Sequence, residues 1–367
     1  MSDKKIPWWS PEMGQEEQRL VKEVLDSNYV NEGKLALEFE QKIADRVGAK
    51  YGIVTTSCTI AIFLALKGLG VGKGDEVIVP DMTFIATANA AELTGATPIL
   101  VDVDPATLNM SPEAFRAAIT PRTKAVVPVH VTGRAADLKR IMEIAAEHNI
   151  LVVEDAAEAL MSKHEGKYLG TFGKAGCFSF SPNKTITTGQ GGIVVTDDPE
   201  LNIRIRELKD QGRPQRGSGG NDLHNTIGYN FKFSNLHSAV GLGQLTYLDQ
   251  RIKRQRRIYE IYRDNLKDVP EITLYPCDLE GGAVPQWTDI ATDRRDELEA
   301  YLQTKNVDTR KYWYPLHTQL AYKEGDERFP NSTKTSPRSL WLSSAYSLSD
   351  EDVLMVCGHI KDFFRTT

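Results

Sequence analysis

The most informative stretch of the sequence is Cys177-Phe178-Ser179-Phe180-Ser181-Pro182-Asn183-Lys184-Thr185-Ile186-Thr187-Thr188-Gly189-Gln190-Gly191-Gly192. This stretch runs from an apolar, strand-like segment through one lysine into a polar turn rich in glycine. Another apolar run, Ile193-Val194-Val195, follows directly. Because both flanks are apolar, we expect Lys184 to lie between buried walls and not on the surface. A lysine desolvated in this way is a usable amine nucleophile.

A second unusual feature, a pair of carboxylates, lies about thirty residues earlier in the chain. Glu154 and Asp155 directly follow the apolar pair Val152-Val153. We expect this acidic pair and Lys184 to lie at the carboxyl ends of successive strands. A lysine and an acid so placed favour pyridoxal phosphate chemistry, in which the lysine forms a Schiff base and the acid holds the pyridine nitrogen.

Seven short runs rich in β-branched residues predict strands. They are Tyr51–Thr55, Glu76–Pro80, Thr97–Val101, Lys124–His130, Ile150–Glu154, Cys177–Phe180 and Gly192–Thr196. The first five are separated by stretches long enough for helical crossovers, such as Ala135–His148 with its helical apolar period. About a dozen residues separate the last two runs, which predicts an antiparallel or wide-loop connection. The sequence therefore predicts an α/β fold with a mixed, mainly parallel seven-stranded sheet.

The length of 367 residues allows one large domain and one smaller domain. We expect a large domain over 1–245, whose segment 1–50 lies on the substrate side, and a small C-terminal α/β domain over 246–367. Leu236–Leu274 is helical in character, and its basic run from Arg251 to Arg257 indicates a solvated or interdomain face. The loop Gln211–Asn221, rich in Gly, Arg and Gln, is typical of a mobile or partner-facing segment.

The composition excludes several classes of function. A net charge of −6 gives no basic field for nucleic acid or an anionic membrane. The four cysteines lie far apart with no Cys-x-x-Cys pair, so we expect neither a metal site nor a disulfide framework. The N-terminus has no apolar run typical of a signal peptide, and no run of about 18 apolar residues exists. We therefore expect a cytoplasmic protein.

Several motifs together resemble the DegT/DnrJ/EryC1/StrS family of sugar-nucleotide aminotransferases. They are Gly74–Pro80, Thr83–Asn89, Glu154–Ala159, Ser179 with Lys184, Thr187–Gly192, Gly228–Lys232 and Tyr314–His317. Each motif alone is weak, but together they follow the family's order over nearly the whole chain. The resemblance implies the pyridoxal-phosphate-dependent transferase fold type I, which is the fold of aspartate aminotransferase.

The resemblance also implies roles around the cofactor. Lys184 would form the Schiff base and later act as the acid–base that moves the proton. Asp155 would keep the pyridine nitrogen protonated, although a strand-end Asp is also a common helix N-cap. Glu158 would lie beside the ring oxygen, where relatives often have Gln. Phe84 would stack on the ring, although an apolar aromatic side chain taken alone is more typical of the core.

The cofactor's phosphate requires hydrogen-bond donors. Ser57, Cys58 and Thr59 open the apolar helix predicted from Ile60, and a helix N-terminus is a natural anion site. Relatives usually have Gly at the position of Cys58. By resemblance, Ser179 and, from the neighbouring subunit, Asn230 would supply further ligands, with Lys232 standing where relatives commonly have Arg. The contribution from a second subunit implies a homodimer with shared active sites.

The resemblance places further residues where relatives contact the sugar or the nucleotide. They are Tyr29, Asn31, Arg213, Trp313, Tyr314 and His317. A diphosphate or a carboxylate would suit Arg213, and His317 is equally consistent with a structural role.

The implied reaction transfers an amino group from L-glutamate to the keto carbon of a nucleotide-diphospho-linked 4-keto-6-deoxy sugar. The segment Pro285–Asp289 is similar to the perosamine synthase-like branch, which favours amination at C4 over C3. Two alternatives within the resemblance are a 3-keto sugar aminotransferase and a sugar 3-dehydratase, in which histidine replaces the lysine. A third is a non-catalytic regulatory or binding relative. Lys184 argues against the dehydratase. The set of Lys184, Asp155 and Ser179, together with the lack of a basic DNA-reading helix, argues against the regulator.

Overall fold

The structure, a computed structural model, describes residues 4–214 and 222–365. A seven-stranded sheet in the order β1-β9-β8-β5-β4-β2-β3 forms its centre. The strands are β1 (Tyr51–Thr55), β2 (Glu76–Pro80), β3 (Thr97–Val101), β4 (Thr123–Val126), β5 (Leu151–Asp155), β8 (Ala175–Ser179) and β9 (Gly192–Thr196). Strand β9 is antiparallel to both β1 and β8, whereas the other neighbouring pairs are parallel.

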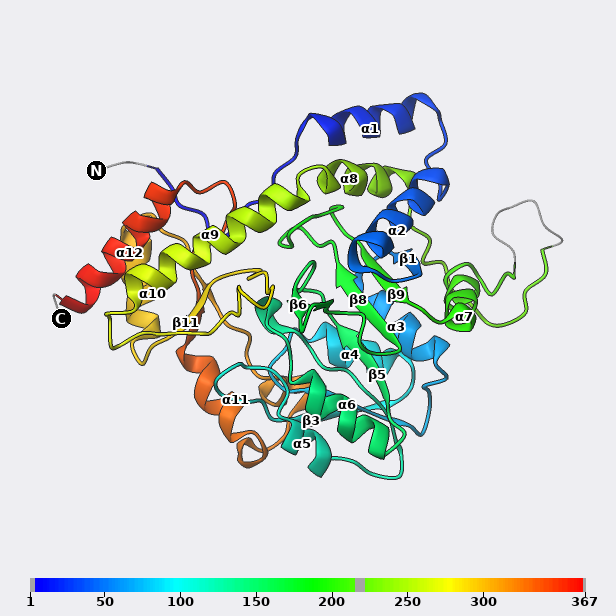
Figure 1. Cartoon of the computed structure of the whole chain (residues 1–367). Helices are drawn as coiled ribbons and strands as arrows, with labels where there is room; N and C mark the ends of the chain where they lie inside the picture. The colour runs from blue at the N-terminus through cyan, green and yellow to red at the C-terminus, as the bar shows by residue number, and fades with distance from the viewer. Residues whose placement is uncertain (1–3, 215–221, 366–367) are drawn as a thin grey trace.

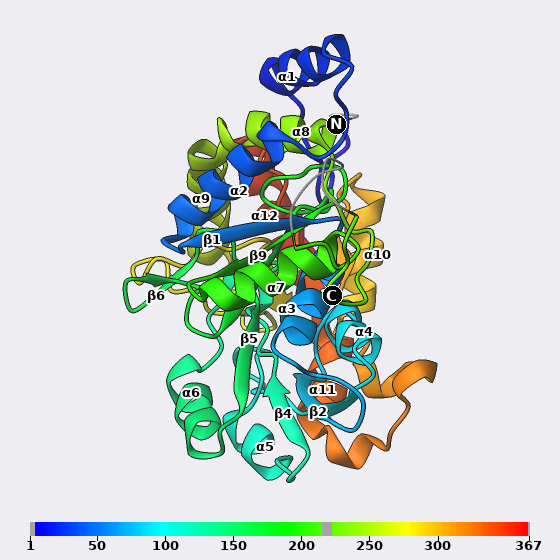
Figure 2. The same cartoon turned by 90° about the vertical axis from the view of Figure 1, so that its right-hand side faces the viewer.

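Helices cover both faces of this sheet because its strands are apolar on both sides. One face packs against α3 (Cys58–Gly68), α4 (Ala86–Leu93) and α7 (Pro199–Lys209). The other face packs against α2 (Lys34–Val47) and α8 (Asn235–Leu245), and further along against α5 (Pro112–Ala117) and α6 (Leu138–Glu147). Figure 2 shows α2 above β1 and α7 below it. Helix α1 (Gln15–Asp26) lies over α8 (Figure 1).

The C-terminal part has its own antiparallel sheet in the order β10-β11-β13-β12. The strands are β10 (Thr273–Leu274), β11 (Asp289–Ala291), β12 (Arg310–Lys311) and β13 (Ser339–Trp341). They pack with α9 (Leu248–Leu266), α10 (Arg295–Thr304) and α12 (Asp350–Arg365), while α11 (Pro330–Thr335) follows the loop after β12. Figure 1 shows α9 running from α8 toward α12.

Residues 4–14, here called the N-terminal strap, cross between the two parts of the fold. Ile6 pairs with Val307 and is fully buried in the core formed by α9, α10 and α12. The residues around Ile6 therefore pack with the predicted small domain, although they precede the predicted large domain in sequence.

The fold prediction is confirmed in its main features, including the mixed seven-stranded sheet and the antiparallel return of Gly192–Thr196. The prediction of helical character through Leu274 is wrong at its end, because α9 stops at Leu266 and Thr273–Leu274 forms β10. The basic run from Arg251 to Arg257 does lie on a long helix. Residues 215–221 of the predicted glycine-rich loop lie outside the described residues.

Candidate active site

A cavity of about 320 Å³ lies at the carboxyl ends of the central strands. Its lining comes from the ends of β5 and β8, from the beginning of α3, and from the C-terminal sheet. The predicted residues Ser57, Cys58, Thr59, Phe84, Asp155, Glu158, Ser179, Lys184 and Trp313 all line it. The fold therefore brings nine of the predicted site residues, spread over more than 250 positions of the sequence, to one cavity.

Lys184 projects into this cavity from the connection between β8 and β9. Its side chain is only 12% exposed, and its Nζ lies 3.1 Å from Oε1 of Glu158. The backbone N–H of Thr132 donates to the other Glu158 oxygen at 2.9 Å, which fixes the carboxylate. The ammonium also lies 4.8 Å from the centre of the Trp287 ring. Lys184 is therefore a desolvated amine with one carboxylate partner and one aromatic partner.

The backbone beside Lys184 is held from two directions. Thr185 donates from its N–H and from its hydroxyl to Oε1 of Gln286, at 3.2 and 2.9 Å. On the other side, the indole of Trp9 donates to the carbonyl of Pro182 at 3.1 Å. Because these contacts come from the C-terminal part and from the N-terminal strap, both parts of the fold position Lys184.

Asp155 ends β5 at the floor of the cavity and is buried. The hydroxyl of Thr87 donates to its Oδ2 at 2.7 Å, and the N–H of Ala157 donates to its Oδ1 at 3.1 Å. Burial raises the pKa of Asp155 above its ordinary value, and these two hydrogen bonds only partly offset it. A cationic N–H in the cavity would supply the countercharge, so this carboxyl group fits the protonated nitrogen of a pyridine ring.

The beginning of α3 forms another wall of the cavity. Ser57 caps the helix by accepting from the N–H of Ile60, and Cys58 and Thr59 follow it. The first amides of a helix have no intrahelical acceptors and bind anions readily. Cys58 has no positive φ, so a cysteine meets the backbone requirement where relatives usually have Gly. Burial raises the pKa of its thiol well above the ordinary value, which leaves it a neutral wall.

Gly192, the first residue of β9, allows the sheet to approach this helix end. A Cβ at Gly192 would lie 2.5 Å from the backbone N of Cys58 and 2.6 Å from the backbone carbon of Ser57. A backbone contact of that length requires the helix to move. Ser179 pairs with Gly192 in the sheet, so this junction places Ser179 on the same cavity as Ser57, Cys58 and Thr59.

We expect Gly192→Ala to lower the free energy of unfolding by about 1–3 kcal/mol, because an added methyl overpacks this junction. It should also weaken pyridoxal phosphate retention by displacing the α3 amides. Urea unfolding and equilibrium dialysis of the cofactor would measure the two effects. Gly358→Ala is the matched control, since a Cβ there meets nothing within 4 Å. Equal effects of the two substitutions would contradict the role of Gly192.

The C-terminal part of the chain contributes residues that were not among the predicted site residues. Trp287, Arg310 and Trp341 line the cavity with Trp313. The guanidinium of Arg310 lies 4.8 Å from the ring centre of Trp8 and 5.7 Å from that of Trp341. Trp287 belongs to the segment Pro285–Asp289, which marked the family branch, so that segment was a signal for its position.

Six further predicted residues do not line this cavity in the chain described. They are Tyr29, Asn31, Arg213, Asn230, Tyr314 and His317. Tyr29 and Tyr314 are exposed, while Arg213 pairs with Asp222 at 2.8 Å. Asn230 forms a β-bridge to Asp210, which also pairs with Lys232 at 3.1 Å. The contribution of Asn230 to a neighbouring subunit stays a prediction.

His317 is fully buried away from the cavity. Its Nδ1 lies 2.7 Å from Oδ2 of Asp81, and its ring stacks on Phe329 with 4.6 Å between centres. Its backbone N–H also donates to Asp81 at 2.7 Å. These contacts give His317 a structural role, which joins the end of β2 to the loop after β12.

The described residues show no group of three or more His, Cys, Asp and Glu side chains that could hold a metal ion. Within the same residues, no helix is both long enough and apolar enough to cross a membrane.

The fold and the cavity define the chain as an aminotransferase of the type I pyridoxal-phosphate-dependent class. The model of the DegT/DnrJ/EryC1/StrS aminotransferase family matches residues 11–361, and the chain belongs to this family.

Relatives and solved structures agree with this assignment. The chain is 40% identical over 364 residues to a GDP-perosamine synthase from Escherichia coli O157:H7, covering 98% of this chain and 99% of the relative. It superposes with a TM-score of 0.92 on the aminotransferase TlmJ from Streptoalloteichus hindustanus, at 32% identity over 99% of this chain and 100% of that one. DesI, solved in the presence of its TDP-sugar product, gives a TM-score of 0.90 at 30% identity over 98% and 93% of the two chains.

Proposed function

We propose that this aminotransferase moves an amino group from L-glutamate to C4 of a nucleotide-linked 4-keto-6-deoxy sugar, with pyridoxal phosphate as its cofactor. The observation that carries the proposal is the meeting of Lys184, Asp155 and the beginning of α3 in one cavity. The relative named GDP-perosamine synthase and the TDP-sugar complex of DesI support a sugar-nucleotide substrate.

The residues present fit this cofactor. Ser57, Cys58, Thr59 and Ser179 would hold its phosphate, Asp155 its ring nitrogen, and Phe84 would cover its ring. When bound, the cofactor supplies an electron sink that stabilises the negative charge left when a proton leaves the donor's α-carbon. We propose that Nζ of Lys184 accepts that proton, because its position in the same cavity allows direct transfer. Glu158, 3.1 Å away, would orient the amine and balance its charge.

We also propose that Arg310 binds a carboxylate of the amino donor. The α-carboxylate of glutamate is attached to the reacting carbon, so its partner must lie in the same cavity as Lys184. Arg310 lines that cavity, and the planar guanidinium group matches a carboxylate. Burial lowers the pKa of Arg310 from its ordinary value, but an arginine guanidinium remains cationic at neutral pH.

We expect Arg310→Gln to raise the KM for L-glutamate by roughly 10- to 100-fold, which corresponds to one lost charge-assisted hydrogen-bonded pair of about 1.5–3 kcal/mol. The KM for the keto sugar should change much less. Steady-state kinetics with each substrate varied in turn would measure the two values.

Lys311→Gln is the matched control, because Lys311 is the next residue on β12 and its Nζ instead pairs with Asp296 at 2.9 Å and Glu299 at 3.1 Å. A rise confined to the KM of the keto sugar would assign Arg310 to the nucleotide's diphosphate instead.

The test of the proposed reaction is a product assay. The protein loaded with pyridoxal phosphate would be incubated with L-glutamate and 4-keto-6-deoxy sugars linked to GDP, UDP or dTDP, and in parallel with the corresponding 3-keto sugars. Mass spectrometry would detect the amino sugar, and carbon NMR would identify the aminated carbon.

We expect 2-oxoglutarate and a 4-amino sugar in equal amounts with one of the three nucleotides. A 3-amino product, obtained only from a 3-keto sugar, would replace the C4 assignment by the C3 alternative. Cofactor binding without conversion of any keto sugar or of glutamate would favour a regulatory or binding role.

A further inference from the structure

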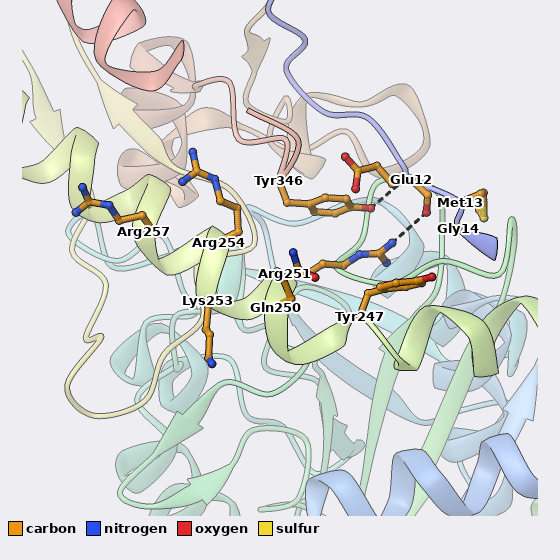
Figure 3. Close-up of a pocket in the computed structure, with 10 residues that line it drawn as sticks. All are labelled: Glu12, Met13, Gly14, Tyr247, Gln250, Arg251, Lys253, Arg254, Arg257 and Tyr346. Atoms are coloured by element: carbon orange, nitrogen blue, oxygen red, sulfur yellow. Dashed lines mark hydrogen bonds between the residues drawn. The ribbon is translucent and has the colours of Figure 1, made fainter. Parts of the chain in front are cut away.

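A second cavity, of about 460 Å³, lies outside the active site where α8 meets α9. Its lining shares no residue with the active-site cavity. Glu12, Met13 and Gly14 of the N-terminal strap form one wall, Tyr346 forms another, and Tyr247, Gln250, Arg251, Lys253, Arg254 and Arg257 complete it (Figure 3). The volume is within the range of small-molecule sites.

Cations outnumber carboxylates around this cavity. Arg251, Lys253, Arg254 and Arg257 all line it, and Glu12 is the acidic residue among its lining. Asp350 contacts Arg254 and also lies 2.9 Å from Arg257, so it offsets a further unit of charge. Glu260 lies 3.8 Å from Arg257 and offsets another unit. Four cations and three carboxylates leave one positive charge, which favours an anionic ligand.

Arg254 has hydrogen-bond donors that the protein leaves unused. Its Nη1 donates to Asp350, but its Nε and Nη2 are buried and have no hydrogen-bond partner in the part of the chain that the structure describes. A buried donor without an acceptor destabilises the folded protein, because it has lost its hydrogen bonds to water. An oxygen-rich ligand in the cavity would restore those bonds, because a guanidinium presents its donors as a planar fork.

Arg251 has a different part in the cavity. Its guanidinium donates to the carbonyl of Glu12 at 3.0 Å, and it lies 4.6 Å from the ring centre of Tyr346 and 5.7 Å from that of Tyr247. Figure 3 shows it between the two rings. It also donates to the carbonyl of Thr185 at 3.3 Å. These contacts hold the Arg251 side chain in place, and its bond to Thr185 links this cavity to the residue after Lys184.

From this arrangement we propose that the cavity binds a phosphate-bearing small molecule, with Arg254 as its principal contact. A phosphate ester carries about 1.5–2 negative charges at neutral pH, opposite in sign to the uncompensated charge of the cavity. Its oxygens are hydrogen-bond acceptors, and they would accept from Nε and Nη2 of Arg254, which have no acceptor in the described residues. Arg251 lines the cavity and donates to the carbonyl of Thr185, the residue after Lys184. A bound ligand would therefore be separated from the catalytic lysine segment by one side chain.

The test is calorimetric titration of the holoenzyme with inorganic pyrophosphate, so that pyridoxal phosphate already fills the phosphate site of the active-site cavity. We expect binding by the wild-type protein and an affinity at least tenfold weaker for Arg254→Gln. Arg263→Gln removes the same charge from the same helix at a residue outside the cavity and should leave the affinity unchanged.

Asp350→Asn provides a second variant, which removes the carboxylate that competes for Arg254 and should tighten binding severalfold. A parallel titration with GDP distinguishes the ligand's source. Because the proposed active site would also bind GDP, only the binding that Arg254→Gln weakens is compared: tighter binding than pyrophosphate assigns a nucleotide, and equal binding assigns the phosphate group alone. The absence of pyrophosphate binding, or equal affinity of the wild-type protein, Arg254→Gln and Asp350→Asn, would overturn the proposal.

Discussion

Lys184→Ala is expected to lower the rate of transamination by roughly 10⁴-fold or more, since it removes both the covalent anchor and the acid–base group. In the structure this amine is 12% exposed and paired with Glu158, and no other lysine lines the cavity among the described residues. A neighbouring lysine therefore cannot replace it. Release of 2-oxoglutarate from L-glutamate in a single turnover would measure the loss. The visible absorption of the bound cofactor should also stop responding to glutamate.

Two variants separate the chemistry of Lys184 from its charge and from general damage. Lys184→Arg keeps the cation near Glu158 but offers no amine nucleophile, so it should be as inactive as the alanine variant. Lys174→Ala removes an exposed lysine ten residues earlier, beside the start of β8, and should retain activity. If Lys184→Arg kept even one tenth of the wild-type rate, a catalytic role of the amine would be contradicted.

The central sheet was predictable because its signal is local. Runs such as Tyr51–Thr55 and Glu76–Pro80 have β-branched apolar residues at their centres and are buried along nearly their whole length, which is typical of strands buried on both faces. The short gap before Gly192 predicted an antiparallel or wide-loop connection, and β9 is antiparallel to β8. The part of the site built on these strand ends, including Asp155 and Lys184, followed from the same signal together with the family resemblance.

The residues contributed by the C-terminal sheet could not be predicted in the same way. Strand β12 has two residues, and its place in the sheet depends on pairing with β13, about thirty residues later. Nothing local in the sequence around Arg310 indicates that its side chain meets Trp8 and lines the same cavity as Lys184. Such contacts between distant segments depend on tertiary packing, which periodicity does not report.

His317 shows the opposite difficulty, in which a motif is clear but its role is not. The motif Tyr314–His317 was recognisable, but burial of the imidazole depends on Asp81 at the end of β2, more than 230 residues away in the sequence. An unpaired histidine and one held by a buried carboxylate have the same local sequence. The partner, and not the motif, determines the role.

Asp155→Asn is expected to lower activity by roughly 10³-fold, as is typical when one preorganised electrostatic contact at the reaction centre is lost. The amide is nearly isosteric with the carboxyl group and can still accept from Thr87, so the cavity should keep its shape. The neutral amide cannot keep a pyridine nitrogen protonated, and the electron-withdrawing capacity of the ring would decrease. The rate of 2-oxoglutarate release at saturating cofactor would measure this loss.

The same substitution should stabilise the cofactor-free protein at neutral pH. Burial raises the pKa of Asp155 above 3.8, so the folded state binds this proton more tightly than the unfolded state. The resulting stability is fully present below that value and is lost as pH rises through the raised pKa. The amide of the variant has no proton to lose in this range, so the excess in melting temperature of Asp155→Asn over wild type should grow from pH 4 to pH 7.

Asp264→Asn, at an exposed carboxylate whose pKa is lowered by Arg263, should show no such growth. A constant or shrinking excess would show that Asp155 does not carry an uncompensated buried charge in the cofactor-free protein.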